Sequence, residues 1–444
     1  MPSARLRFGP GNVQIHANTL PLQITMPNVA NLMERSLPGP VLDVLRSAAL
    51  VASRETVKVH ELYLVGGMVR DLLRGESSVD IDLSVVGNGP GYATALSNEL
   101  GGQVTKVSEF GTAAIETDAF TVDVATARVE TYAHPGALPD VTPSGITEDL
   151  ARRDFTINAM AIDLSSDSWG ELIDPHGGMS DLMMKRVKTL HPDSFADDPT
   201  RALRAVRYEA RLGFKIQPTT VDDIQRDGAH FDAVSPARVL ADFRFILGET
   251  TRAEALGRAE ELGVLGSISP AFRISSRSLQ AIKDTPDREP LFHVSLIGAR
   301  LTKSEAGTLI KRLDPPADWR EALGAGSTYQ EIASVLERSD LRPSEIAELL
   351  SGFPILALEA QLQLAPATRQ RAALRSWLEE LRFREPLLSG DDLLEAGVPQ
   401  GPLIGRLLDE LRRARLDRIV GTRDDELTLV KRRLRVMLSN GNGR

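Results

Sequence analysis

Two aspartates one residue apart, Asp80 and Asp82, begin an apolar segment that is predicted to form a strand. Side chains i and i+2 of a strand project from the same face, so both carboxylates would point into one space. Carboxylates held that close repel each other unless a cation lies between them. Oxygen ligands suit a hard cation such as Mg2+, which proteins bind through one or two carboxylates plus substrate phosphates. An isolated Asp-x-Asp is more often a solvated strand edge, but the surrounding sequence favours a metal site.

A glycine pair, Gly66 and Gly67, ends the apolar run 62–65 that precedes these acids. A glycine turn at the start of a helix presents unbonded backbone N–H groups to an anion, and Arg70 lies in the first turn of the helix expected there. The order strand, glycine pair, short helix and acid-bearing strand predicts a nucleotide-binding site that carries a metal ion.

These residues form the unit GG-x-VRD followed by DID, which resembles the opening motif of the class II tRNA nucleotidyltransferases and of the related bacterial poly(A) polymerases. The resemblance implies a third acid on a neighbouring strand, which ligates the metal or takes the proton of an attacking hydroxyl. Asp123, flanked by apolar residues, matches that position. An isolated aspartate in a strand more often forms an ion pair or a turn.

The segment 152–159, RRDFTINA, resembles a second motif of the same family. The resemblance implies that Arg153 contacts the phosphate or sugar of the incoming nucleotide and that Asp154 contacts its ribose. The planar guanidinium of arginine suits bidentate contact with a phosphate.

Three arginines, Arg201, Arg204 and Arg207, recur every three residues in a segment that is predicted to form a helix from the Asp-Pro pair 198–199 onward. At that spacing they follow one flank of the helix, where they form either a cationic groove edge or an ordinary solvated surface. Asp198 is also a candidate N-cap of this helix.

The segment 197–201, DDPTR, resembles the family's EDxxR motif, with an aspartate in place of the first glutamate. The resemblance implies that Asp198 and Arg201 bind the Watson–Crick edge of the incoming base, and that Arg204 and Arg207 approach the triphosphate. A carboxylate accepts a hydrogen bond from the exocyclic amine that cytosine and adenine share, whereas guanine and uracil present a carbonyl there.

Short apolar strands alternate with helices between residues 40 and 168, which predicts an α+β fold whose head is a mixed β-sheet with flanking helices. Strands are expected at 61–65, 79–86, about 113–116, 120–125 and 157–164, and helices at 41–53 and 92–100.

After residue 178 helical patterns dominate and convincing strands are not expected, so the head is followed by an all-helical neck, body and tail. Expected helices include 200–212, 237–247, 252–262, 302–313, 343–350, 369–381 and 402–414. A chain of 444 residues is too long to fold around a single hydrophobic core, so we expect several domains. We expect an N-terminal extension (1–39), a catalytic nucleotidyltransferase head (40–168), a neck that recognises the base (169–240), a helical body (241–335) and a tRNA-binding tail (336–444).

The chain contains no cysteine, which excludes disulfides, thiolate metal sites and cysteine nucleophiles. No apolar run reaches the roughly 18 residues of a membrane helix, and no signal peptide is evident, so we expect a cytoplasmic protein without a membrane partner. The net charge of −9 is unfavourable for an RNA partner, but residues 401–444 hold eleven Lys or Arg against six Asp or Glu. These basic residues either contact RNA or belong to solvated helix faces.

The resemblance implies a CCA-adding tRNA nucleotidyltransferase, which transfers CMP and AMP from CTP and ATP to the 3′ end of tRNA, with no DNA partner. Two Mg2+ ions held by Asp80 and Asp82 would align the 3′-hydroxyl with the α-phosphate. The C-terminal helices would bind the acceptor arm by shape and phosphate contacts.

Three alternatives stay open. Bacterial poly(A) polymerases tend to carry a Gly-Arg-Arg-Phe-like signature, which the stretch 101–107 lacks. CC-only enzymes lack a flexible loop whose place is taken here by the Pro- and Gly-rich segment 128–149, so its presence favours an enzyme that also adds adenosine; an A-only enzyme is not excluded. A non-catalytic RNA-binding protein is the third alternative, against which the intact acids argue.

Overall fold

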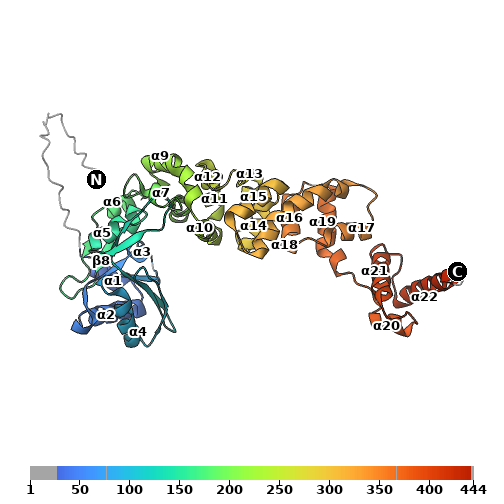
Figure 1. The fold of residues 1–444 in the computed structure, drawn as a ribbon, viewed down its shortest axis with the longest axis horizontal. Coiled ribbons are helices and arrows are strands. Elements are labelled where there is room, and N and C mark those ends of the chain that lie inside the picture. The colour runs from blue at the N-terminus through green and yellow to red at the C-terminus, as the bar shows by residue number, and fades with distance from the viewer. Residues whose placement is uncertain (1–27, 77, 367, 442–444) are drawn as a thin grey trace, which may run out of the picture. The chain divides into compact units, whose positions relative to one another are not determined.

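The computed structural model describes residues 28–441 apart from 77 and 367, so most of the expected N-terminal extension lies outside the described part (Figure 1). The chain divides into two compact units. Of the described residues, the first unit comprises those within 28–127, 143–150 and 158–175, and the second comprises those within 128–142, 151–157 and 176–441. Within the described residues, no helix is long and apolar enough to cross a membrane.

The first unit is built on a seven-stranded sheet with the order β3-β4-β5-β2-β1-β8-β9. Its strands are β1 (Val59–Val65), β2 (Ile81–Gly87), β3 (Gln103–Val107), β4 (Thr112–Glu116), β5 (Thr121–Thr126), β8 (Ala161–Asp163) and β9 (Leu172–Ile173). Its helices are α1 (Ala30–Ser36), α2 (Gly39–Ala52), η1 (Glu55–Val57), α3 (Gly67–Leu73) and α4 (Gly89–Leu100), while α5 (Ile146–Ala151) and η2 (Thr156–Asn158) cross into the second unit.

The sheet is mixed, as the sequence predicts, because β2 and β5 run parallel while the other neighbouring strands pair antiparallel. Side chains at the start of β2 and in β5 alternate as expected for strands with one covered face, since Ile81, Leu83, Val122 and Val124 are buried, whereas residues 83–85 of β2 are all buried. Helices α2 and α4 pack together (Figure 1), and the buried Tyr92 of α4 donates a 2.7 Å hydrogen bond to the carbonyl of α2's Ala48.

The predicted strand 157–164 is wrong over its first half. Only β8 forms there, and the 3₁₀ turn η2 precedes it. Two side chains explain the difference. Thr156 donates to Asp181 at 2.8 Å and Asn158 accepts from Arg70 at 2.7 Å, and both contacts are buried. These polar contacts hold the segment in a tight turn rather than in the sheet.

The segment 128–149 is not simply a loop, because β6 (Arg128–Thr131) and β7 (Asp140–Pro143) form a two-stranded sheet and α5 follows. The edge strand β3 was also not predicted. Its side chains are mostly exposed, so it shows no apolar alternation.

The second unit is helical apart from β6, β7 and a parallel pair, β10 (Arg186–Val187) with β11 (Lys215–Ile216). Its first helices are α6 (Gly178–Met183), α7 (Ser194–Asp197), α8 (Arg201–Leu212), α9 (Pro218–Asp227), η3 (Gly228–Ala233), α10 (Pro236–Gly248), α11 (Arg252–Glu261), α12 (Val264–Ile268), α13 (Ser276–Lys283) and α14 (Pro290–Gly298). They are followed by α15 (Lys303–Leu313), α16 (Ala317–Ala333), η4 (Val335–Glu337), α17 (Pro343–Leu350), α18 (Ile355–Leu364), α19 (Arg369–Glu379), η5 (Leu381–Phe383), α20 (Gly390–Glu395), α21 (Pro402–Leu416) and α22 (Arg423–Gly441).

The helices expected after residue 178 are present within two residues at each end. The β10–β11 pair contradicts the expectation of no strands there, since strands of two residues are too short to leave a periodic pattern. Apolar side chains of the C-terminal helices form two buried clusters, one around Leu350, Leu358 and Leu374 and another around Leu393 and Leu411. Burial of these apolar side chains stabilises the helices, because intrinsic helix propensity alone would not keep helices of this length folded.

Candidate active site

Asp82 of β2 and Asp123 of β5 are paired residues of neighbouring parallel strands. Paired side chains of adjacent strands lie on the same face of the sheet. Asp80 precedes β2 by one residue and is two residues before Asp82. Asp80 and Asp123 are exposed and Asp82 is half-buried, whereas their apolar neighbours in the strands are buried. The sheet therefore brings together the three acids singled out in the sequence.

The electrostatics of this edge fit a site for a cation. Although the residue as a whole is exposed, partial desolvation of its carboxyl raises the pKa of Asp123; Lys106 opposes the rise and Asp80 adds to it. Among the described residues there is no group of three or more His, Cys, Asp or Glu side chains that could hold a metal ion by themselves. A pair of carboxylates that leaves other positions to water and substrate phosphates is the arrangement in which proteins usually bind Mg2+, so the donor set fits that ion.

The glycine turn between β1 and α3 has the conformation that its sequence predicts. Gly66 has φ 74° and ψ −138°, a region that only glycine adopts easily. Arg70 is buried, donating to Asn158 at 2.7 Å and to both carboxylate oxygens of Asp71 at 2.9 and 2.8 Å. The guanidinium thus joins the helix that follows the glycine turn to Asn158, and its predicted nucleotide contact stays a prediction.

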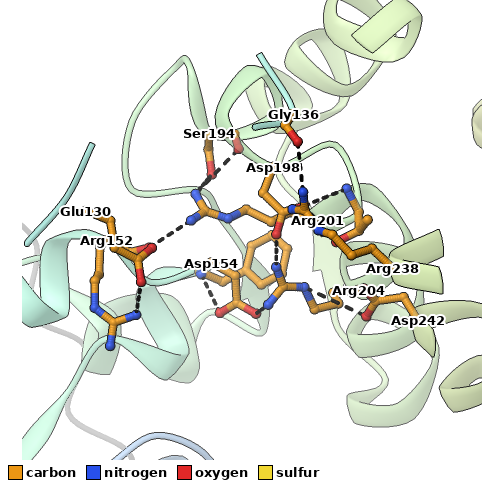
Figure 2. A network of polar contacts seen from close by, with 12 residues as sticks. Glu130, Gly136, Arg152, Asp154, Ser194, Asp198, Arg201, Arg204, Arg238 and Asp242 are labelled. Carbon is orange, nitrogen blue, oxygen red and sulfur yellow. Dashed lines mark hydrogen bonds and ion pairs between the residues drawn. The ribbon is translucent and has the colours of Figure 1, made fainter. Parts of the chain in front are cut away.

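In the second unit, Asp198 is the centre of a polar network (Figure 2). Its Oδ1 accepts from the Thr200 amide at 3.0 Å, the Thr200 hydroxyl at 2.7 Å and Arg238 at 2.9 Å. Its Oδ2 accepts from Arg204 at 2.8 Å. Burial alone would raise the pKa of Asp198, but Arg204, Thr200 and Arg238 together lower it. Asp198 is therefore held on both oxygens by groups that favour its ionised form.

Asp198 is not the N-cap of α8, because that position belongs to Thr200 and the helix begins at Arg201. Asp198 instead follows α7 as its C-cap residue. Its bonds to the amide and hydroxyl two residues later form a local turn that fixes the entry into α8.

Arg204 lies among three carboxylates rather than facing open solvent. Its guanidinium is 2.8 Å from Asp198, 3.5 Å from Asp154 and 3.9 Å from Asp242. Although burial acts in the opposite direction, these acids raise its pKa. Asp154 is buried and also accepts from the Phe155 amide at 2.8 Å. The structure brings the two predicted motifs together through Arg204, and its role as a triphosphate contact stays a prediction.

Arg201 is buried beside this network (Figure 2). Its Nη1 donates to the Ser194 hydroxyl at 2.7 Å and its Nη2 to the Arg152 carbonyl at 2.8 Å. Its Nε is buried without a hydrogen-bond partner in the described part of the chain. The Nε groups of Arg204 and Arg207 on the same helix are also buried without a hydrogen-bond partner among the described residues, so this feature does not by itself mark a ligand position.

The surroundings of Arg207 and Arg153, the other two arginines predicted to contact the nucleotide in this unit, differ from those of Arg201 and Arg204. Arg207 lies over the rings of Tyr208 and Phe245, 5.1 and 5.0 Å from their centroids, and within the described residues it forms no ion pair shorter than 4 Å. Arg153 is half-buried in the turn before Phe155.

Three residues of this network were not predicted from sequence. Arg238 and Asp242 of α10 contact Asp198 and Arg204, respectively. Glu130 of β6 accepts from Arg152 at 2.9 Å, and so supports the residue whose carbonyl holds Arg201. Charged side chains usually belong to a solvated surface, and nothing local in the sequence marks these three half-buried residues as part of a network.

Comparisons of the sequence and of the fold with known proteins find similar proteins in one family of nucleotidyltransferases. Residues 62–188 match the family described as poly A polymerase head domain. The chain is 36% identical to the A-adding tRNA nucleotidyltransferase of Geobacter sulfurreducens over 93% of this chain, and it spans 49% of that longer protein. It is 31% identical to the A-adding tRNA nucleotidyltransferase of Halalkalibacterium halodurans, over 86% of this chain and 90% of that one. A solved apo structure of a CCA-adding enzyme aligns with a TM-score of 0.78 at 25% identity, covering 91% of this chain and 98% of that one.

Proposed function

Because the chain belongs to the class II tRNA nucleotidyltransferase family, we propose that it transfers AMP from ATP to the 3′ end of tRNA with Mg2+ as its metal ion. The observation that carries this proposal is the pairing of Asp82 with Asp123 on parallel strands, with Asp80 two residues before Asp82. Three carboxylates on one edge of a sheet, following a glycine turn, match the chemistry of phosphoryl transfer.

Enzymes of this family use a divalent metal ion, and Asp80 and Asp82 would hold it. When bound, such an ion neutralises charge on the triphosphate and favours loss of the proton from the attacking hydroxyl. Asp123, whose pKa is raised, can accept that proton or serve as a further ligand. The remaining contribution to catalysis is the positioning of the tRNA 3′-hydroxyl against the α-phosphate of the nucleotide.

Base recognition follows from the Asp198 network. Oδ2 of Asp198 has one donor, Arg204, and keeps capacity for the exocyclic amine of adenine. By its match to the EDxxR motif, Arg201 would supply a donor for a ring nitrogen. Guanine and uracil offer a carbonyl where adenine offers the amine, so Asp198 would face an acceptor and reject them.

Addition of CMP as well as AMP is the second candidate. The amine that Asp198 would bind is shared by cytosine, and the segment 128–149 is present with ordered strands β6 and β7. The two A-adding relatives favour transfer of AMP alone. The basic C-terminal helices would bind the tRNA, and the cytoplasmic location and the division into head, neck, body and tail stay predictions.

The test supplies two tRNAs, one without its CCA end and one lacking only the terminal adenosine, with each nucleotide alone and with CTP and ATP together. One AMP added to the second tRNA supports the proposal. Completion of CCA on the first tRNA supports the second candidate. Long adenosine tails indicate a poly(A) polymerase, arrest after two cytidines a CC-adding enzyme, and no incorporation with Mg2+ a binding protein.

A further inference from the structure

Arg238, at the start of α10, connects two parts of the second unit that are far apart in sequence. Its Nη2 donates to Oδ1 of Asp198 at 2.9 Å, and its Nη1 donates to the Gly136 carbonyl at 2.8 Å (Figure 2). Gly136 lies between β6 and β7, and its amide donates to the Ala196 carbonyl at 2.9 Å. The arginine is therefore fixed at both ends of its planar guanidinium, which restricts its motion.

The hydrogen bonds of Asp198 are unequally divided between its two oxygens. Each carboxylate oxygen has about two lone-pair sites. Oδ1 already accepts from two groups of Thr200 and from Arg238, so it is saturated. Oδ2 accepts only from Arg204 and can take one more donor. Which oxygen is available to a ligand is thus decided by the groups that occupy Oδ1.

We propose that Arg238 is a positioning residue for base selection, which holds Oδ1 of Asp198 so that Oδ2 is presented to the exocyclic amine of the incoming base. This inference rests on the proposed function. Thr200 bonds Oδ1 through its own amide and hydroxyl, and Arg204 bonds Oδ2 and is shared with Asp154 and Asp242, so Arg238 is the one cation among the described residues that bonds Oδ1. Without it only Thr200 and Arg204 restrain the carboxylate, so its orientation is less tightly fixed and an amine and a carbonyl are distinguished less well.

The experiment compares Arg238→Met with Arg244→Met. Arg244 lies on the same helix, is exposed, and stacks on Trp319 at 5.3 Å, away from Asp198. We measure kcat and KM for ATP and GTP on tRNA lacking its terminal adenosine. Loss of one charged hydrogen bond is expected to lower the ATP-to-GTP ratio of kcat/KM about tenfold or more, mainly through KM for ATP. Arg244→Met is expected to keep the wild-type ratio.

Two further variants separate positioning from packing. Arg238→Lys retains a charged donor for Oδ1 and is expected to recover most of the selectivity. In an Asp198→Asn background, Arg238→Met is expected to change the ratio no further, because the residue acts through Asp198. An equal loss of rate with both nucleotides, or an undiminished effect in the Asp198→Asn background, would overturn the inference.

Equilibrium binding of ATP and GTP without tRNA separates this inference from the proposed function. A wild-type protein that transfers no nucleotide but binds ATP more tightly than GTP would refute the proposed function alone. The inference then holds if Arg238→Met reduces that preference about tenfold, and it fails if the preference is unchanged.

Discussion

Arg204 donates a 2.8 Å hydrogen bond to Oδ2 of Asp198, the oxygen that we assign to base recognition. The same guanidinium lies 3.5 Å from Asp154, fifty residues earlier in the chain. One cation therefore joins the RRDFTINA and DDPTR segments. Arg204, which is predicted to approach the triphosphate, thus also contacts the two carboxylates that are predicted to bind the nucleotide.

Removing Arg204 is expected to destabilise the second unit, because Asp154 and Asp198 would lose a shared cation in a largely buried setting. Losing one partner of a buried ion pair costs about 3 kcal/mol or more. For Arg204→Met we expect the thermal midpoint to fall by roughly 5–10 °C, measured by calorimetry. Arg211→Met on the same helix, whose side chain is 47% exposed, should leave the midpoint nearly unchanged. Equal shifts in the two variants would contradict the bridging role.

The pKa of Asp198 predicts how its contribution to stability depends on pH. Burial would raise this pKa, but Arg204, Thr200 and Arg238 lower it. A carboxyl whose pKa is lowered by folding stabilises the protein above its unfolded pKa of about 3.9, and loses that contribution as pH falls through the folded value. The midpoint difference between wild type and Asp198→Asn should be constant from pH 8 to about 5 and shrink below about pH 4.

The neighbouring Asp197 is expected to show the opposite dependence of stability on pH. Burial raises its pKa, although His191 and Arg201 act to lower it. Its ionised form is less favourable in the folded protein, so stability is lost as pH rises through the folded pKa. Asp197→Asn should leave the midpoint at pH 7 unchanged or slightly raised. Matching pH profiles for the two variants would show that the neighbouring acids do not differ in this way.

Much of the site could be predicted because its signals are local. Asp80 and Asp82 alternate within one strand, the glycine turn immediately follows another strand, and the arginines recur along one helix. Their pattern could be read without any tertiary contact, and the motif resemblance added the roles. The pairing of β2 with β5 then placed Asp123 beside Asp82, which sequence spacing does not determine.

The missed features depend on packing between distant segments. Arg238 meets Asp198 only because α10 packs against α8, and Asp242 reaches Arg204 for the same reason. Likewise, the turn at η2 replaces a strand because Thr156 and Asn158 bond to residues 25 and 88 positions away. Such contacts leave no periodic trace in the sequence.

Single substitutions of the acids Asp80 and Asp123 are expected to cause a large loss in the rate of nucleotide incorporation. Asp123→Asn removes a candidate proton acceptor, and general-base groups contribute about 10²- to 10⁴-fold. Asp80→Ala should abolish incorporation while leaving tRNA binding nearly unchanged. Single-turnover incorporation and filter binding measure the two properties. Asp118→Asn, in the exposed turn between β4 and β5, is the matched control and should behave as wild type.

Arg201→Ala should blur discrimination against GTP and UTP more than it weakens metal binding. The buried guanidinium donates to Ser194 and Arg152, and the match to the EDxxR motif assigns the residue to the base. Selectivity should fall about tenfold, whereas the Mg2+ concentration for half-maximal rate should change little. Unchanged selectivity with altered Mg2+ dependence would refute the base-recognition role.

The basic C-terminal helix α22 yields a prediction about tRNA that does not involve the chemistry. Lys431, Arg432 and Arg435 are exposed and, within the described residues, form no ion pair, whereas Arg433 pairs with Glu410. Cations that neutralise phosphates release counterions, and each contact steepens the logarithmic dependence of affinity on salt by about 0.7–0.9. Replacing the three unpaired residues by glutamine should raise KM for tRNA, leave KM for ATP unchanged and reduce the salt slope by up to about 2–3.

Arg433→Gln, which removes a cation already paired with Glu410, should change the slope less. An unaltered slope in the triple variant would mean that this helix face is solvated and that tRNA is bound elsewhere.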